Sequence, residues 1–184
     1  MKTDLSAYNN SWYNPGSPLK RFLWHYTNAI IFKSGLFPLY GLKTFLLRAF
    51  GAEIGKGVYI KPFVNIKYPW FLKIGDFVWI GENVWIDNLA KITIGNNVCL
   101  SQGSMLLTGN HNYKKPGFDL SIKSIIIEDG TWIGAKAIVC PGVTCKNHSI
   151  LTVGSVALKD LEPYSVNTGN PAEKIKDRLP EEVL

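Results

Sequence analysis

Residues 74–86 of the chain read IGDFVWIGENVWI. An isoleucine returns at every sixth position of this stretch, at Ile74, Ile80 and Ile86, and glycine follows the first two. An α-helix would repeat its apolar positions at about 3.6 residues and an open strand at about 2, so this longer period requires short strands separated by regular corners. It is the period of the hexapeptide repeat of a parallel β-helix.

The same repeat extends far beyond this stretch. It begins at Ile54, shifts by two positions at Ile74 and again at Ile94, is lost after Leu106 and resumes at Ile127. Its aliphatic or small positions are Ile54, Ile60, Ile66, Leu72, Ile74, Ile80, Ile86, Ile92, Ile94, Leu100, Leu106, Ile127, Ile133, Val139, Cys145, Leu151 and Ala157. Three hexads form a triangular coil of about eighteen residues with these side chains pointing inward. The sequence therefore predicts an all-β fold, a left-handed parallel β-helix.

The repeat divides the chain of 184 residues into three parts. Residues 54–162 are expected to form the β-helix, with a protruding loop at 107–124 where the period is lost. Residues 1–53 are expected to form an apolar and basic N-terminal cap with helices, and residues 163–184 a C-terminal tail. An apolar content of 46% suffices for one cored domain, and a charged content of 18% argues against disorder.

Residues 19–50 allow two compatible interpretations. No acidic residue lies between Asp4 and Glu53, so residues 1–53 carry six basic and two acidic side chains, +4 of the net charge of +6. Helices in this segment would cover the open first coil, as a solenoid requires, or lie as a basic amphipathic surface on anionic lipid. No apolar run reaches membrane-spanning length, and no signal peptide is recognisable. Bulky apolar residues interleave the charge, which argues against nucleic acid as a partner.

The three cysteines, Cys99, Cys140 and Cys145, form no Cys-x-x-Cys pair. Their odd number is typical of reduced thiols in a cytosolic protein, so we expect a cytoplasmic location, peripheral on the membrane if residues 19–50 bind lipid. Cys145 falls on an inward position of the repeat and is expected to be a small core residue rather than a zinc ligand. We expect no metal site.

The loop excursion contains the leading catalytic candidate, His111. Repeat proteins tend to place insertions on their working face, and His111 follows Gly109 and Asn110, which permit a tight turn. The alternative is a solvated loop histidine. The other two histidines, His25 and His148, receive no catalytic role.

Several motifs point to a known family. With the hexads, the loop Thr108-Gly109-Asn110-His111 and the closing Gly169-Asn170-Pro171-Ala172, the chain resembles the hexapeptide-repeat O-acetyltransferases related to galactoside and maltose acetyltransferases. Further segments are similar to the colanic acid biosynthesis acetyltransferase WcaF group, and these are residues 5–8, 13–16, 46–52, 68–70 and 85–88.

This resemblance implies an acetyl-CoA-dependent O-acetyltransferase that acts on a sugar hydroxyl of an exopolysaccharide repeat unit, free or as a lipid-linked oligosaccharide. In the family the loop histidine is the general base, which matches His111, and no covalent acyl-enzyme is formed. The family's usual assembly is a homotrimer with coenzyme A in a groove between subunits. A non-catalytic β-helix that binds carbohydrate or serves as a scaffold is the alternative.

The resemblance also implies roles for other positions. Asp87 or Asn88 is expected to orient the acceptor, unless the pair is a polar corner that bonds its own backbone, and the backbone N–H of Ala135 is expected to stabilise the oxyanion. The residues that match the coenzyme path are Trp132, Gly134, Ala135, Val153 and Lys159. Three later cations, Lys174, Lys176 and Arg178, either pair with its phosphates or form a solvated face.

Overall fold

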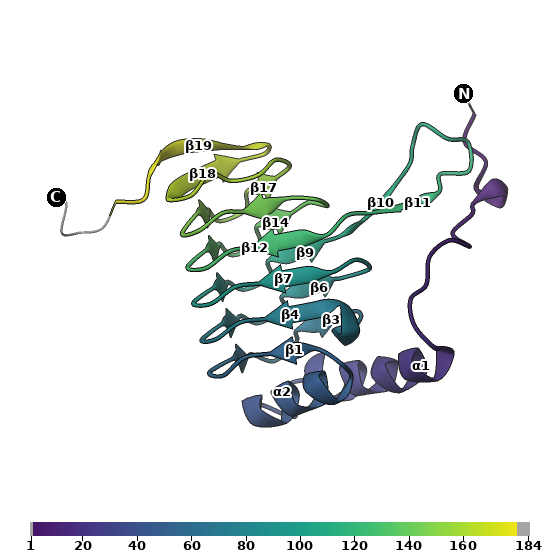
Figure 1. Ribbon diagram of the computed structural model, residues 1–184, viewed down its shortest axis with the longest axis horizontal. Coiled ribbons are helices and arrows are strands. Elements are labelled where there is room, and N and C mark those ends of the chain that lie inside the picture. Colours follow the sequence, from purple (N-terminus) through teal and green to yellow (C-terminus); the bar gives the residue numbers. More distant parts are fainter. Residues whose placement is uncertain (1, 180–184) are drawn as a thin grey trace.

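The computed structural model describes residues 2–179 and shows the predicted parallel β-helix, with helices lying across one end and a hairpin projecting from the side (Figure 1). Its strands form three faces of a triangular prism. Face one consists of β1 (Glu53–Ile54), β4 (Leu72–Ile74), β7 (Ile92–Ile94), β12 (Ile125–Ile127) and β15 (Thr144–Cys145). Face two consists of β2 (Tyr59–Ile60), β5 (Trp79–Ile80), β8 (Cys99–Leu100), β13 (Trp132–Ile133), β16 (Ile150–Leu151), β18 (Ser165–Gly169) and β19 (Ala172–Asp177). Face three consists of β3 (Asn65–Ile66), β6 (Trp85–Asp87), β9 (Met105–Leu107), β14 (Ile138–Val139) and β17 (Val156–Ala157).

The core is the column of inward residues that the repeat predicts. From Ile60 to Ala157 every one of them is at most 3% exposed. They stack in register between coils, as Ile60 on Ile80 and Ile80 on Leu100. A second inward position lies two residues earlier in most hexads, and its buried apolar members include Ala52, Val58, Val64, Val78, Val84, Val98, Ile125, Ala137 and Val143. The prism is therefore filled from two positions in each hexad.

The shifts in the repeat have a structural cause on face one. In β4 both Leu72 and Ile74 point inward with the exposed Lys73 between them, and in β7 Ile92 and Ile94 do the same. Side chains of a strand alternate between its two sides, so the two inward residues of such a strand are two positions apart and the hexad count restarts at the second. The repeat thus slips by two positions without leaving the prism.

Three helical segments cover the open end of the first coil, which confirms the predicted cap. They are α1 (Pro18–Thr27), the π-helical turn η2 (Asn28–Phe32) and α2 (Tyr40–Ala49). Helix α1 begins where the Ser17 hydroxyl accepts from the backbone N–H of Lys20, with proline at its first position. In the described part of the chain, 2–179, none of the helices combines the length and the apolar character that a membrane span requires.

Side chains of the cap satisfy the outermost carbonyls of all three faces. The carbonyl of an inward residue accepts from a backbone N–H of the preceding coil, as Ile80 O accepts from Lys61 N, so the corresponding carbonyls of the first coil have no preceding coil to accept from. The Arg48 guanidinium donates to Ile54 O on face one at 2.9 Å, and the Trp24 indole donates to Ile66 O on face three at 2.8 Å. The cap therefore replaces a missing coil.

On face two this role falls to Lys43, whose side chain is fully buried. Its ammonium donates to Ile60 O at 3.3 Å and to Lys61 O at 2.9 Å. Burial lowers the pKa of Lys43, since the charged form loses its hydration. The two carbonyls compensate for that loss.

The chain's end adds to the prism rather than leaving it. Strand β18 pairs in parallel with β16 on face two, and β19 turns back antiparallel to β18. Most of the segment predicted as a tail thus covers the last coil, and residues 180–184 lie outside the described part.

Replacing Lys43 with Met should lower the free energy of unfolding by about 1–3 kcal/mol, because two buried carbonyls lose their donor. The exposed Lys91→Met change is the matched control and should alter it by less than about 0.5 kcal/mol. Urea denaturation of both variants measures the difference. Equal stability of the two variants would contradict the capping role of Lys43.

Candidate functional site

The predicted protruding loop is a two-stranded hairpin on the edge between faces three and one. Strand β10 (Gly109–His111) follows β9 directly and pairs antiparallel with β11 (Leu120–Ile122), so that His111 lies opposite Leu120. The hairpin extends away from the prism, and the N-terminal segment runs beside it (Figure 1). The sequence placed its leading catalytic candidate on this hairpin.

The ring of His111 is held at one edge and on one face. Its Nδ1 lies 2.8 Å from Phe118 O, and its ring stacks on the Phe118 ring with centroids 4.4 Å apart and planes 8° apart. A carbonyl oxygen only accepts, so Nδ1 carries the proton and Nε2 of the neutral imidazole keeps its lone pair. Within residues 2–179 no hydrogen bond occupies Nε2. A half-buried histidine with this tautomer is suited to accept a proton.

An N-terminal strap, residues 4–13, packs on the same hairpin. The backbone N–H of Asp4 donates to Pro116 O at 2.9 Å, and that of Asn9 donates to the Asp119 carboxylate at 3.1 Å. The Tyr8 ring lies 6.0 Å from the ring of His111. The strap thus fixes the hairpin from a region about a hundred residues away in sequence.

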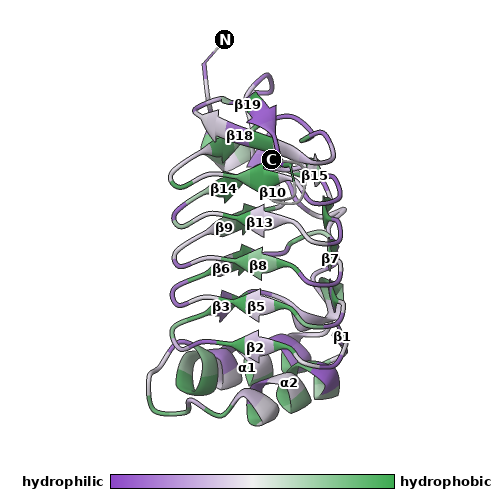
Figure 2. Ribbon diagram, turned by 90° about the vertical axis from the view of Figure 1, so that its left-hand side faces the viewer, coloured by the Kyte–Doolittle hydropathy of each residue, from purple (hydrophilic) through white to green (hydrophobic). Residues whose placement is uncertain are grey.

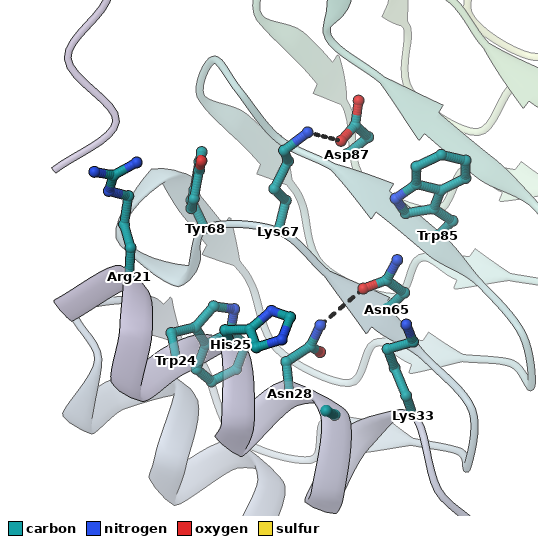
Figure 3. Close-up of a pocket in the computed structure, with 11 residues that line it drawn as sticks. Arg21, Trp24, His25, Asn28, Lys33, Asn65, Lys67, Tyr68, Trp85 and Asp87 are labelled. Atoms are coloured by element: carbon teal, nitrogen blue, oxygen red, sulfur yellow. Dashed lines mark hydrogen bonds and ion pairs between the residues drawn. The ribbon is translucent and has the colours of Figure 1, made fainter. Parts of the chain in front are cut away.

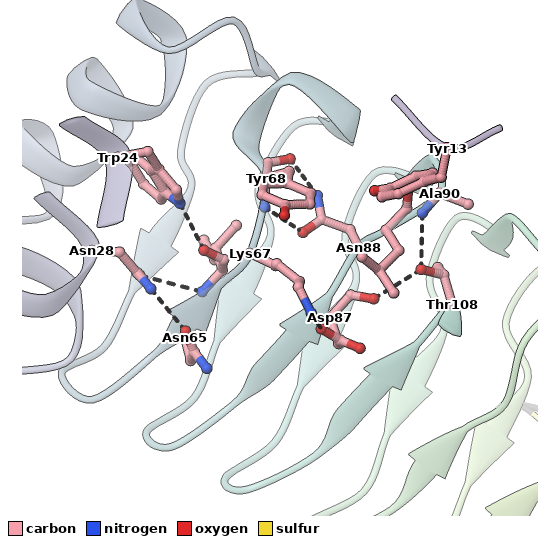
Figure 4. Close-up of polar contacts among 12 residues, drawn as sticks. Tyr13, Trp24, Asn28, Asn65, Lys67, Tyr68, Asp87, Asn88, Ala90 and Thr108 are labelled. Carbon is pink, nitrogen blue, oxygen red and sulfur yellow. Dashed lines mark hydrogen bonds and ion pairs between the residues drawn. The ribbon is translucent and has the colours of Figure 1, made fainter. Parts of the chain in front are cut away.

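Asp87 lies where the hairpin leaves the prism, at the end of β6. The Thr108 hydroxyl donates to Asp87 O at 2.8 Å, and the Lys67 ammonium lies 3.0 Å from the carboxylate (Figure 4). A methyl group added at Gly109 would stand 3.7 Å from that carboxylate. Asp87 therefore lies beside the base of the strand that carries His111.

Asn88 takes the structural role that the sequence left open. It is fully buried, its amide donates to Tyr68 O at 2.6 Å, and its oxygen accepts from the Tyr68 backbone N–H at 3.0 Å. Both polar atoms are committed to the corner before the short helical turn η3 (Pro69–Phe71). Of the two acceptor candidates, only Asp87 faces the open surface.

A cleft of about 350 Å³ opens next to Asp87, between the cap and face three (Figure 3). Its lining residues come from α1, η2, β3, β6 and the corner after β3, and they are Arg21, Trp24, His25, Asn28, Ala29, Lys33, Asn65, Lys67, Tyr68, Trp85 and Asp87. Two lysines and one arginine oppose the single carboxylate. The cleft therefore has a cationic lining with aromatic walls.

Sequence reasoning missed most of this cleft. Tyr13 also belongs to its surroundings: its hydroxyl donates to Leu89 O at 2.8 Å, and burial, together with Tyr68 and Asp87, raises its pKa. Tyr13 and Tyr68 lay in segments that resembled the family, but the repeat pattern gave no signal for Arg21, because it belongs to the helical cap.

The residues expected to bind the coenzyme form two groups in the structure, one beside β13 and one of cations nearer the end of the chain. Trp132, Gly134, Ala135 and Val153 gather on the edge between faces two and three, where Ala135 and Val153 take the same corner position in successive coils. A methyl group at Gly134 would lie 2.7 Å from the Val153 backbone nitrogen, so glycine is required for the close approach of these coils. Among the described residues, the Ala135 N–H has no acceptor. An uncommitted N–H is free to meet an oxyanion.

The later cations are spread over the end of the prism. Lys159 lies 3.7 Å from Glu173, and Lys174 lies 2.6 Å from Asp177, both as exposed ion pairs. Arg178 donates to Gly130 O and to His148 O, so its guanidinium holds a corner of the prism. Lys176 is exposed on β19. Of these four cations, Lys159, Lys174 and Lys176 are therefore exposed, whereas Arg178 is committed to the fold.

The candidate base and the candidate oxyanion donor lie on different edges of one chain. His111 projects from the edge between faces three and one, whereas Ala135 lies on the edge between faces two and three. The whole width of face three separates the two edges.

Comparison with known proteins identifies the family, although no family model matches the chain. A relative from Escherichia coli K12, named as a candidate colanic acid biosynthesis acetyltransferase, WcaF, is 38% identical over 96% of this chain and 97% of its own length. The chain belongs to the hexapeptide-repeat acetyltransferases. Within them it falls in the colanic acid biosynthesis WcaF group.

Solved structures of hexapeptide-repeat acetyltransferases share the fold. One from Vibrio cholerae, complexed with acetyl coenzyme A, superposes with a TM-score of 0.81 at 24% identity over 91% of this chain and 93% of that one. A galactoside acetyltransferase in complex with coenzyme A gives 0.77 at 24% identity over 88% of this chain and 82% of its own. The present acetyltransferase thus shares its solenoid with enzymes that handle this coenzyme.

Replacing Gly117 with Ala should detach the strap from the hairpin, because the new methyl group would lie 2.6 Å from Ala7 O. If the substitution weakens the contact between strap and hairpin by about 1 kcal/mol, the fraction of molecules with the strap detached should rise roughly fivefold. Hydrogen exchange at the backbone N–H groups of Asp4 and Asn9 measures this fraction. Gly41→Ala, where a methyl group meets nothing within 4 Å, is the control and should leave those rates unchanged. Unchanged rates in the Gly117 variant would show that this contact does not hold the strap.

Proposed function

We propose that this acetyltransferase transfers the acetyl group of acetyl coenzyme A to a hydroxyl of a sugar in an exopolysaccharide repeat unit, with His111 as general base. The observation that carries the proposal is the bond between Nδ1 of His111 and Phe118 O, which leaves Nε2 as a proton acceptor. The colanic acid name of the E. coli relative supports an exopolysaccharide acceptor. The coenzyme complexes of the related folds support the donor.

The reaction needs no covalent acyl-enzyme. Nε2 of His111 takes the proton of the sugar hydroxyl while the oxygen forms a bond to the thioester carbonyl carbon. The Ala135 N–H stabilises the resulting oxyanion. When the tetrahedral intermediate collapses, the carbon–sulfur bond breaks and the thiolate takes the proton back from Nε2. The products are the acetyl ester and the free thiol of coenzyme A.

The acceptor is proposed to lie in the cleft beside Asp87. A carboxylate accepts hydrogen bonds from sugar hydroxyls, and the aromatic walls formed by Tyr68 and Trp85 suit the apolar face of a sugar ring. Lys67 keeps the Asp87 carboxylate oriented. The reacting hydroxyl would then point along β10 toward His111.

The coenzyme is proposed to run along the edge that carries Trp132, Gly134, Ala135 and Val153. The exposed side of Trp132 is fixed there by its bond to the Ser101 hydroxyl, at 2.8 Å. Lys159, Lys174 and Lys176 are the cations available for the phosphates beyond it, whereas Arg178 is held in the fold. The three free cysteine thiols suit a reaction in the cytoplasm.

A homotrimer is proposed because the base and the oxyanion donor lie on different edges of one chain. Face two supplies an apolar surface for such packing, since Tyr59, Trp79 and Trp132 form an outward row with exposures of 47%, 62% and 47%. These rings follow one another in register through Cys99. Cyclic assembly would let each hairpin reach a neighbour's edge.

His111→Ala should lower kcat by about 10² to 10⁴ and leave the fold intact, because only proton transfer is lost. Tyr113→Ala, an exposed change on the same hairpin, is the matched control and should keep near wild-type turnover. Thiol release from acetyl coenzyme A with sugar acceptors, including colanic acid fragments, measures both. Full turnover of the His111 variant would overturn its role, and saccharide binding without any thiol release by the wild type would instead indicate a binding protein.

Ala135→Pro removes the proposed oxyanion donor and should lower kcat by about 10² to 10³. Proline fits this corner, since Pro62 holds the same position in the first coil. If sites are shared between subunits, unfolding and refolding the two inactive variants together, His111→Ala and Ala135→Pro, should restore part of the activity. Refolding each variant alone is the control. If the two variants regain no activity when they are refolded together, the two residues of one site belong to the same chain.

A further inference from the structure

The outer side of the cap carries an apolar surface that the prism does not bury. Helix α1 and η2 turn Trp24, Asn28 and Phe32 toward the first coil. On the opposite side, at helical spacing, lie large apolar side chains that are 49–68% exposed, and these are Leu19, Phe22, Leu23, Tyr26 and Ile30. Phe45 on α2 adds a further ring at 64%. We call these six residues the outer cap face.

This arrangement reverses the usual pattern of a surface helix, whose outward side is polar. Figure 2 shows hydrophobic stretches on both helices at the base of the prism. The face lies at the end of the prism, whereas packing of prisms side by side uses their flat faces. Scattered apolar residues need no explanation, but a continuous stripe on one helix marks an interaction surface.

The charge around the face indicates its partner. No acidic residue occurs from residue 5 to residue 52, and Lys33 is an exposed cation of the same segment. Lys56 and Lys61, at corners of the first coil, are exposed as well. An apolar stripe on a segment that carries cations and no acidic residue matches the boundary between acyl chains and anionic headgroups.

We propose that the outer cap face docks on the surface of an anionic membrane. Its apolar side chains enter the headgroup region, and the neighbouring cations meet lipid phosphates. The inner side of the same helix, through Arg21 and His25, lines the cleft beside Asp87. Docking therefore brings that cleft to the bilayer surface, where an acceptor attached to a lipid reaches it without leaving the membrane.

Sedimentation with vesicles tests this proposal on the full-length protein. Wild type should bind vesicles of phosphatidylcholine with phosphatidylglycerol at least about tenfold more strongly than phosphatidylcholine alone, and added salt should weaken the binding. The triple variant Phe22→Ser, Ile30→Ser, Phe45→Ser should bind the vesicles with phosphatidylglycerol at least about tenfold more weakly than the wild type does. The control triple variant Ile126→Ser, Ile175→Ser, Leu179→Ser removes exposed apolar groups far from the cap and should bind as wild type does.

Two readouts keep this proposal separate from the proposed reaction. Thiol release with a water-soluble acceptor should be unchanged in the cap variant, because none of its three positions lines the cleft. Absence of wild-type binding to phosphatidylglycerol vesicles, or equal binding by the cap variant, would overturn the docking proposal. Light scattering gives a further test. If it shows a doubled assembly that the same three substitutions separate, a second copy of the protein covers the outer cap face, and the docking proposal is overturned.

Discussion

The structure depends on one constraint: each coil satisfies its backbone through its neighbours. Carbonyls of the inward residues accept from backbone N–H groups of the preceding coil, so the stack can begin only where something else pairs with the carbonyls of the first coil. Arg48, Lys43 and Trp24 do this for faces one, two and three in turn. A buried lysine and a buried tryptophan in a helical segment are explained by this need, because unpaired carbonyls at a buried end would cost more than their burial does.

The same constraint determines where a site can form. Strands are fixed by their register with the coils above and below, so only corners can depart from the prism without breaking the ladder. The hairpin with His111 leaves from one corner, and Ala135 occupies another. Asp87, at the last residue of β6, is the point where ladder and hairpin meet. The two candidate groups, His111 and Ala135, are therefore spaced by the width of a face, and this spacing is the reason for proposing a site between subunits.

The cap serves two sides at once. Its inner side closes the core and lines the cleft, and its outer side presents apolar residues of a segment that contains no acidic residue. The sequence left capping and lipid contact as compatible alternatives for residues 19–50, and the helical geometry separates them by residue: Trp24, Phe32 and Lys43 face the prism, whereas Phe22, Ile30 and Phe45 face away. One segment can therefore stabilise the fold and still interact with a partner.

The sequence by itself determined the prism, because a hexad is a local pattern and its aliphatic residues stack wherever the chain completes a coil. It also singled out His111, since an excursion from a strict period is visible without coordinates. Tertiary structure alone decided the tautomer of His111, the burial of Asn88, the approach of Tyr13 to Asp87, the place of Arg21 in the lining of the cleft, and the separation of His111 from Ala135. Each of these depends on contacts between the cap, the strap and distant coils, and no period in the sequence records such contacts.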